Sequence, residues 1–156
     1  MKETSMYKIK FFIFFMLLFS FNVKAADRNE QIKRDGECEG AGIALISQGE
    51  PLSAMSEYST RNYMNILNNS KYKKLTDKWM PTRDACQASS IKKGGNINDI
   101  NNCLAKAIHE PEALLFMKSF NELFNRTLVL YESNNPGDRV IARTLANSAC
   151  LRLPVQ

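Results

Sequence analysis

Four cysteines are the most informative chemical groups in this chain. They stand at Cys38, Cys86, Cys103 and Cys150. An even number of cysteines in a chain that begins like an exported protein predicts disulfides, because compartments outside the cytoplasm are oxidising. Three pairings are possible, and we favour Cys86–Cys103 and Cys38–Cys150. The first would close a short loop that contains two glycines, and the second would tie together the two ends of the domain.

A zinc site is the competing use of these sulfurs. No two cysteines have the short spacing that zinc-binding knuckles use, and His109 is the only histidine. We therefore expect disulfides and no metal site.

Catalytic motifs are missing from the sequence. A serine or cysteine nucleophile needs a neighbouring base, usually histidine, and the sole His109 lies near the end of a predicted helix. Paired carboxylates could hydrolyse a glycosidic bond without histidine, but nothing in the pattern marks an acid as buried. No phosphate-binding loop or dinucleotide glycine motif is present. The candidate acids for such a carboxylate pair are Glu37, Glu39, Glu50 and Glu57. We expect neither enzymatic activity nor a cofactor.

A cluster of lysines around two aromatic residues raises the question of nucleic-acid binding. It comprises Lys71, Tyr72, Lys73, Lys74, Lys78 and Trp79. Lysines could contact phosphates and the rings could stack on bases. The rings, however, fall at helical spacing, which favours a solvated lysine face with apolar residues turned inward. We expect no nucleic-acid partner.

The first 25 residues have the three parts of an export signal. A segment with three lysines precedes the apolar run 11–21, and Val23 and Ala25 suit the positions that signal peptidase reads. The apolar run is too short to span a bilayer, which needs about 20 residues. We expect cleavage after Ala25, one domain over residues 26–156 and no stable membrane insertion. Removing four lysines and one glutamate lowers the formal net charge from +5 to about +2, which gives little reason to expect an anionic partner.

Apolar residues recur at intervals of three and four along the rest of the chain, which predicts helices. Gly49 and Pro51 separate a first helix, over about residues 37–48 with Ile43 and Ile46 inward, from a second. Pro81 predicts a kink or restart in a third segment, and residues 92–96 predict a loop before a helix capped at Asn96 or Asn98. Pro111 would open the longest helix, ending near Glu132 and apolar nearly all round, as buried helices are. Asp138 would cap the last helix, and the glycines around Cys38 would allow close approach to a disulfide or another helix.

The fold class expected is therefore all-α: a small bundle of five or six helices with two disulfides, following a cleaved signal peptide. Such a motif-poor exported domain is compatible with a periplasmic or secreted binding protein of the inhibitor or immunity type, whose partner is a hydrolase or toxin. An accessory subunit or chaperone of a secretion, pilus or conjugation system is the alternative, and a cell-wall hydrolase with paired carboxylates ranks third. The partner would be another exported or envelope protein, and the surplus apolar surface of residues 112–132 also suits a homodimer. Exposed loops at residues 92–96 and 134–138 are where we expect an interface.

Overall fold

The structure is a computed structural model that describes residues 26–151, in which six α-helices and one short 3-10 turn form without a strand. The expected all-α bundle is confirmed. The proposed export signal lies outside the described residues. In chain order the elements are the N-terminal helix (residues 26–47), η1 (Leu52–Ala54), α2 (Glu57–Leu67), α3 (Ser70–Lys92), α4 (Ile97–Ala107), α5 (Pro111–Glu132) and α6 (Pro136–Leu151).

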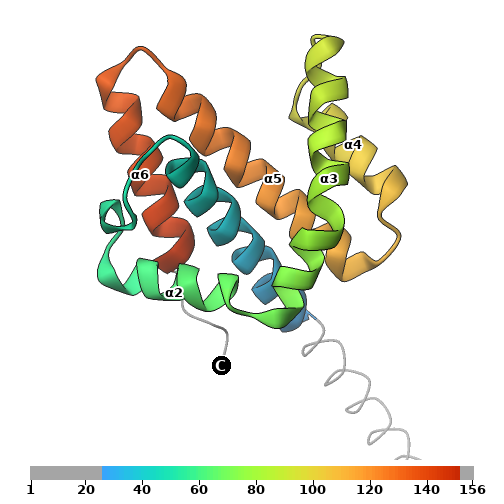
Figure 1. Cartoon of the computed structure of the whole chain (residues 1–156), viewed down its shortest axis with the longest axis horizontal. Helices are drawn as coiled ribbons and strands as arrows, with labels where there is room; N and C mark the ends of the chain where they lie inside the picture. The colour runs from blue at the N-terminus through green and yellow to red at the C-terminus, as the bar shows by residue number, and fades with distance from the viewer. Residues whose placement is uncertain (1–25, 152–156) are drawn as a thin grey trace, which may run out of the picture.

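Two helical hairpins flank the N-terminal helix (Figure 1). The α5–α6 hairpin lies on one side, the α3–α4 hairpin stands on the other, and α2 runs across the base. α5 contacts α3, α4 and α6, which makes it the central element. Its side chains Phe116, Met117 and Phe120 are almost fully buried, as expected for a helix apolar on several faces.

Glycines bring the N-terminal helix against α5. Gly36 and Gly40 lie one turn apart, and the helices run in the same direction (Figure 1). A β-carbon at Gly36 would lie 2.6 Å from the carbonyl oxygen of Phe116, and one at Gly40 would collide with the backbone of Phe120. The glycines thus allow backbone-to-backbone contact between two helices, the second of the two roles expected from the sequence.

Two disulfides join distant parts of this bundle. Cys38 of the N-terminal helix is bonded to Cys150 of α6, and Cys86 of α3 is bonded to Cys103 of α4. These are the two pairs favoured from the sequence. The first links the beginning and the end of the described chain, and the second holds the α3–α4 hairpin together.

The N-terminal helix differs from its expected form. It is already helical at residue 26, eleven residues before the expected start, and Ile46 is 42% exposed. Ile43 packs partly buried against the core, as expected, while the fully buried positions carry the smaller residues Ala41 and Ala44 together with Leu45. Small side chains at these positions permit close packing, which hydrophobic periodicity alone does not indicate.

The helix restart that was one of the two alternatives expected at Pro81 does not occur. α3 continues through Pro81 from Ser70 to Lys92, which makes it one residue longer than α5. Proline removes the backbone donor that would bond to the carbonyl of Asp77, four residues earlier. Pro81 lies on the exposed side of α3, where water can satisfy that carbonyl, so the helix tolerates the loss.

Helix caps agree with the sequence in one of two places. Asn96 caps α4 in a capping box with Asp99. The cap expected at Asp138 is wrong: α6 begins two residues earlier, and the Asn135 side chain accepts a hydrogen bond from the backbone of Gly137. Asp138 instead accepts a hydrogen bond from the hydroxyl of Ser133.

Candidate functional site

Two acidic side chains lie one turn apart on the N-terminal helix, in the seam that it forms with α2 and α3. The first, Asp35, is half-buried and accepts hydrogen bonds from the Tyr72 hydroxyl at 2.6 Å and from the Gln31 amide at 2.7 Å. The Tyr72 ring stacks on Phe116, with 4.8 Å between ring centroids. Burial raises the pKa of Asp35 despite these bonds, and burial together with the Asp35 bond raises the pKa of Tyr72.

The second acid, Glu39, is buried more deeply and is less well satisfied. Glu39 is only 3% exposed, and its Oε2 atom is buried without a hydrogen-bond partner. Burial raises the pKa of Glu39 to about 7, and the nearby charge of Asp35 adds to the shift. Burial, followed by the charge of Glu39, also raises the pKa of Tyr63 to about 12. Glu39 is therefore a carboxyl group whose charge changes near neutral pH.

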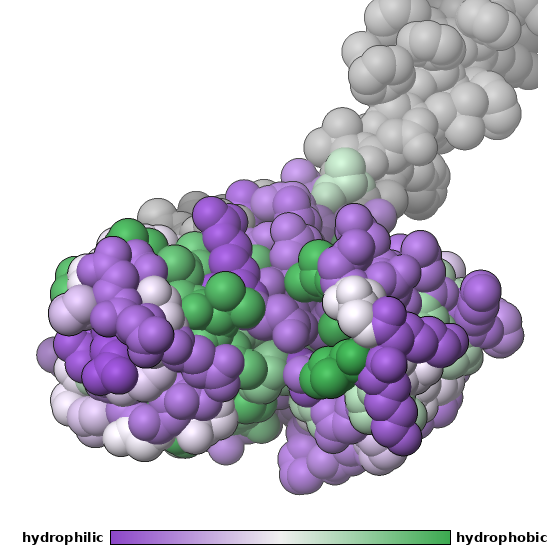
Figure 2. Space-filling model, turned by 90° about the horizontal axis from the view of Figure 1, so that it is seen from above, coloured by the Kyte–Doolittle hydropathy of each residue, from purple (hydrophilic) through white to green (hydrophobic). Residues whose placement is uncertain are grey.

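The two acids line different hollows of the surface. Asp35 lines a small one of about 220 Å³ beside the Cys38–Cys150 disulfide. Glu39 lines a larger one of about 500 Å³ between the N-terminal helix and α3, which we call the Glu39 groove. Its lining residues are Glu39, Ile43, Leu67, Lys73, Thr76, Asp77, Met80, Pro81 and Asp84. Figure 2 shows the molecule hollowed between its two halves, with hydrophobic surface on either side of the hollow.

The Glu39 groove has apolar walls and an acidic rim. Ile43, Leu67 and Met80 pack against the hydrophobic core and supply the walls. At the rim, Asp77 pairs with Lys73 at 2.8 Å. With Asp84 and Glu39, three acids and one lysine line the groove, so its own charges favour a cation.

Arg83 anchors the rim of the groove to α5. It is 5% exposed, its guanidinium carbon lies 4.2 Å from the centroid of the Phe124 ring, and its Nε donates to Asn121. Its Nη1 pairs with Asp84 at 2.9 Å. Burial lowers the pKa of Arg83, and the hydrogen bond and charge of Asp84 partly offset this shift. Asp84 is thus partly neutralised, whereas the free oxygen of Glu39 is not.

The four glutamates considered from the sequence do not come together. Glu37 is buried on the N-terminal helix, 4.0 Å from Lys33, and Glu57 is exposed and pairs with Arg61. Glu50 binds Arg143 at 2.5 Å and the Tyr131 hydroxyl at 2.6 Å. These contacts lower the pKa of Glu50, the Arg143 bond most of all.

Sequence reasoning missed Asp35, the acid whose charge adds to the effect of burial in raising the pKa of Glu39. The signal was present as a spacing of four residues, which places both side chains on one helix face. What could not be read was that this face is covered by α2 and α3.

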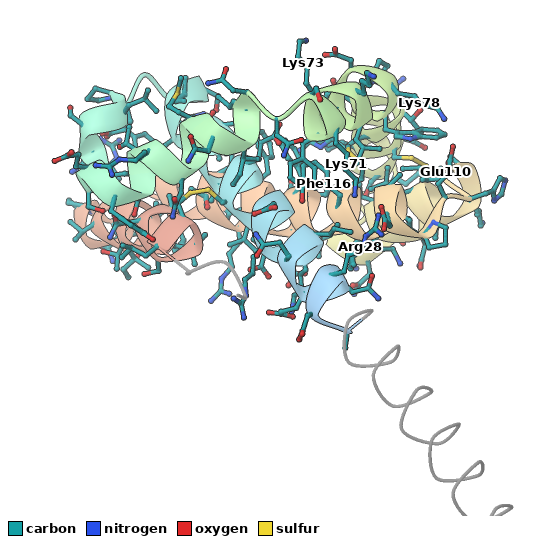
Figure 3. All side chains as sticks on the ribbon, turned by 90° about the horizontal axis from the view of Figure 1, so that it is seen from below. Arg28, Lys71, Lys73, Lys78, Glu110 and Phe116 are labelled. Atoms are coloured by element: carbon teal, nitrogen blue, oxygen red, sulfur yellow. A yellow bond between two sulfur atoms is a disulfide. The ribbon has the colours of Figure 1, made fainter. Side chains whose placement is uncertain are left out.

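Most of the lysine cluster forms ion pairs with acidic side chains. Lys71 pairs with Glu112, which also binds Arg28, and Lys78 pairs with Glu110 at 2.7 Å. In Figure 3, Lys78 and Glu110 lie at the same end of the molecule. Lys78 also covers the Trp79 ring at 4.5 Å. These pairs favour a structural surface over a phosphate-binding one.

The remaining candidate positions lie away from the Glu39 groove. His109 is exposed in the short link between α4 and α5, and the loop containing Gly94 turns at the tip of the α3–α4 hairpin. Near that tip, a third hollow of about 720 Å³ is lined by both polar and apolar groups, and its Asp99 is already used in the cap of α4. Neither place contains a buried carboxyl without a partner.

Comparison with known proteins yields no relative: no protein-family model matches the chain, and neither does any curated protein or solved structure. Among residues 26–151, no group of three histidine, cysteine or acidic side chains is placed to hold a metal ion. In the same part of the chain, every helix is too short or too polar to cross a membrane.

Proposed function

We propose that this protein is an exported, non-enzymatic binding protein of the inhibitor or immunity type, whose partner is a hydrolase or toxin outside the cytoplasm. The observation that carries the proposal is the Glu39 groove. It combines apolar walls with one buried polar group that has an unused acceptor, which is the usual composition of a binding site.

The arrangement of the acids favours binding over glycosidic hydrolysis. Two catalytic carboxyls must face the same bond across one cleft, about 5 to 10 Å apart. Asp35 and Glu39 line separate hollows, and the oxygens of Asp35 already accept hydrogen bonds from Tyr72 and Gln31. The other acids of the Glu39 groove, Asp77 and Asp84, are paired with Lys73 and Arg83. Glu39 is thus the one acid lining this groove without a cationic partner, which suits binding of a ligand better than catalysis by two carboxyls.

Export is supported by the two disulfides and by the leader-like residues 1–25. If the leader is removed as proposed, protein isolated from the periplasm or the medium begins at Ala26. Intact-mass measurement and N-terminal sequencing test this directly. A chain that retains residues 1–25 and remains with the membrane fraction would contradict the proposal.

Partner capture tests the binding function. Immobilised protein, with its disulfides intact, is incubated with periplasmic extract, and the retained proteins are identified by mass spectrometry. We expect a hydrolase or toxin whose activity, assayed after purification, falls when equimolar protein is added. Repeated recovery of the protein itself alone would contradict the inhibitor proposal and favour a homodimer. Recovery of secretion, pilus or conjugation components would favour the accessory-subunit alternative.

A further inference from the structure

The Glu39 groove is lined by an acid with a buried carboxyl oxygen to which no group of the described chain donates a hydrogen bond. Glu39 is one of the residues that line the groove, and its Oε2 atom is buried without a hydrogen-bond partner. An ionised carboxylate without a partner is costly to bury, so a ligand that donates a hydrogen bond and carries positive charge gains more there than in water. The groove therefore favours a cation that can reach its buried acid.

The surrounding charged groups leave Glu39 as the acid of the groove without a cationic partner. Asp77 and Asp84 line the groove from α3, where Asp77 pairs with Lys73 and Asp84 pairs with the buried Arg83. Asp35 on the same helix raises the pKa of Glu39, and Tyr63 of α2 is a neutral neighbour below its pKa of about 12. α5 meets this helix through its backbone at Gly36 and Gly40.

The walls of the groove specify the shape of the cation. Ile43, Leu67 and Met80 offer apolar surface along the way to Glu39, which suits an unbranched chain of methylene groups. An ammonium head group is a compact cation, so it fits beside a carboxyl group that is only 3% exposed more easily than a broad, planar guanidinium does. A lysine side chain combines this stem with this head.

We propose that the Glu39 groove binds a lysine side chain of the partner protein, with its stem against Ile43, Leu67 and Met80 and its ammonium group paired with the Glu39 carboxylate. This inference rests on the proposed binding function and names the group that the partner inserts.

The direct test uses n-butylammonium, which reproduces the lysine side chain, and follows the methyl signals of Ile43, Leu67 and Met80 by NMR. Binding needs the charged form of Glu39, so affinity rises with pH through the pKa of about 7. We expect about a hundredfold weaker binding at pH 5 than at pH 8. 1-Butanol has the same stem without the charge, and it should bind weakly and equally at both pH values.

Two variants locate the binding site. Glu39→Gln keeps the shape of the side chain but removes its charge, and it should weaken butylammonium binding at pH 8 at least tenfold. Glu57→Gln removes an exposed acid far from the groove and should leave binding unchanged. Equal affinity for butylammonium and butanol, equal affinity at both pH values, or an unaffected Glu39→Gln protein would each overturn the proposal.

This titration is independent of partner capture. A failed titration would leave the inhibitor proposal standing with another surface as its interface. A failed capture, with a successful titration, would leave the cation-binding groove standing without the proposed partner class.

Discussion

At the scale of single residues, Glu39 is a buried carboxyl group with an oxygen that has no hydrogen-bond partner. A carboxyl group is usually charged at neutral pH, but burial of Glu39 raises its pKa to about 7. The folded protein therefore retains a proton that the unfolded chain would release. The cost of this arrangement suggests that a ligand, rather than stability, explains why an acid stands at this position.

Replacing Glu39 by glutamine should stabilise the free protein at alkaline pH. The folded pKa of about 7 lies above the reference value of 4.5, so wild-type stability falls as pH rises between these values. Ionisation of Glu39 lowers the free energy of unfolding of the wild type by about 3 kcal/mol above pH 7.5 and has no effect below pH 4.5. Urea unfolding of wild type and Glu39→Gln at pH 5 and pH 8 measures it. A variant that is no more stable than wild type at pH 8 would contradict the burial cost.

The sequence could name Glu39 as an acid but could not single it out. Glu37, Glu39, Glu50 and Glu57 look alike in sequence, and only the packing of α2 and α3 distinguishes them. The cysteines were more informative because their chemistry restricts them to a few pairings.

At the scale of elements, the contact between the N-terminal helix and α5 positions the site. Gly36 and Gly40 allow the two backbones to meet, which sets where Asp35 and Glu39 lie relative to α3. Glycine is a poor helix former, so its presence at two contact positions indicates a requirement for space.

Gly40→Ala should destabilise the protein by about 3 kcal/mol or more, although alanine favours helix formation by about 1 kcal/mol. The added β-carbon would overlap backbone atoms of Phe120, which cannot move like a side-chain end. Gly137→Ala is the matched control: it adds the same atom to an exposed position in α6, where the three nearest atoms belong to the Asn135 side chain. Thermal unfolding compares them, and equal melting temperatures would refute the close contact.

Element boundaries were predictable where local chemistry decides them. Pro111 begins α5, Asn96 caps α4 and Gly49 follows the N-terminal helix with a φ of 79°. The continuation of α3 through Pro81 was not predictable because it depends on the exposure of that position. The exposure of Ile46 was not predictable because the fully buried positions of its helix include the smaller Ala41 and Ala44. Tertiary packing decided these two positions.

At the scale of the whole molecule, the disulfides act on loops of very different length. Cys38–Cys150 spans 112 residues, and Cys86–Cys103 spans 17. A cross-link that closes a longer loop restricts the unfolded chain more strongly. The first disulfide therefore contributes more to the stability of the whole fold, and the second holds one hairpin.

Paired replacement of the cysteines by serine measures this difference. Loss of Cys38–Cys150 should cost about 4.7 kcal/mol and loss of Cys86–Cys103 about 3 kcal/mol in the chain-entropy model. Chemical unfolding of the two double variants gives the values, and non-reducing peptide mapping of wild type checks the pairing. Cross-linked peptides that join Cys38 to Cys86 would contradict the fold.

Helical periodicity and an even cysteine count were enough to predict the class of the whole fold. They could not predict the Glu39 groove, because its two sides come from helices that are far apart in the sequence. Ile43 and Met80 meet there only after the bundle has formed.

The central claim is that the groove contains a buried acid available to a ligand, and the titration of Glu39 in the free protein tests it most directly. NMR of protein labelled with ¹³C at the glutamate carboxyls, assigned with Glu39→Gln, follows this group from pH 3 to pH 9. We predict a midpoint near pH 7. A midpoint near 4.5, the value of a solvated glutamate, would show that the carboxyl is exposed or already paired, and the binding site proposed around it would be wrong.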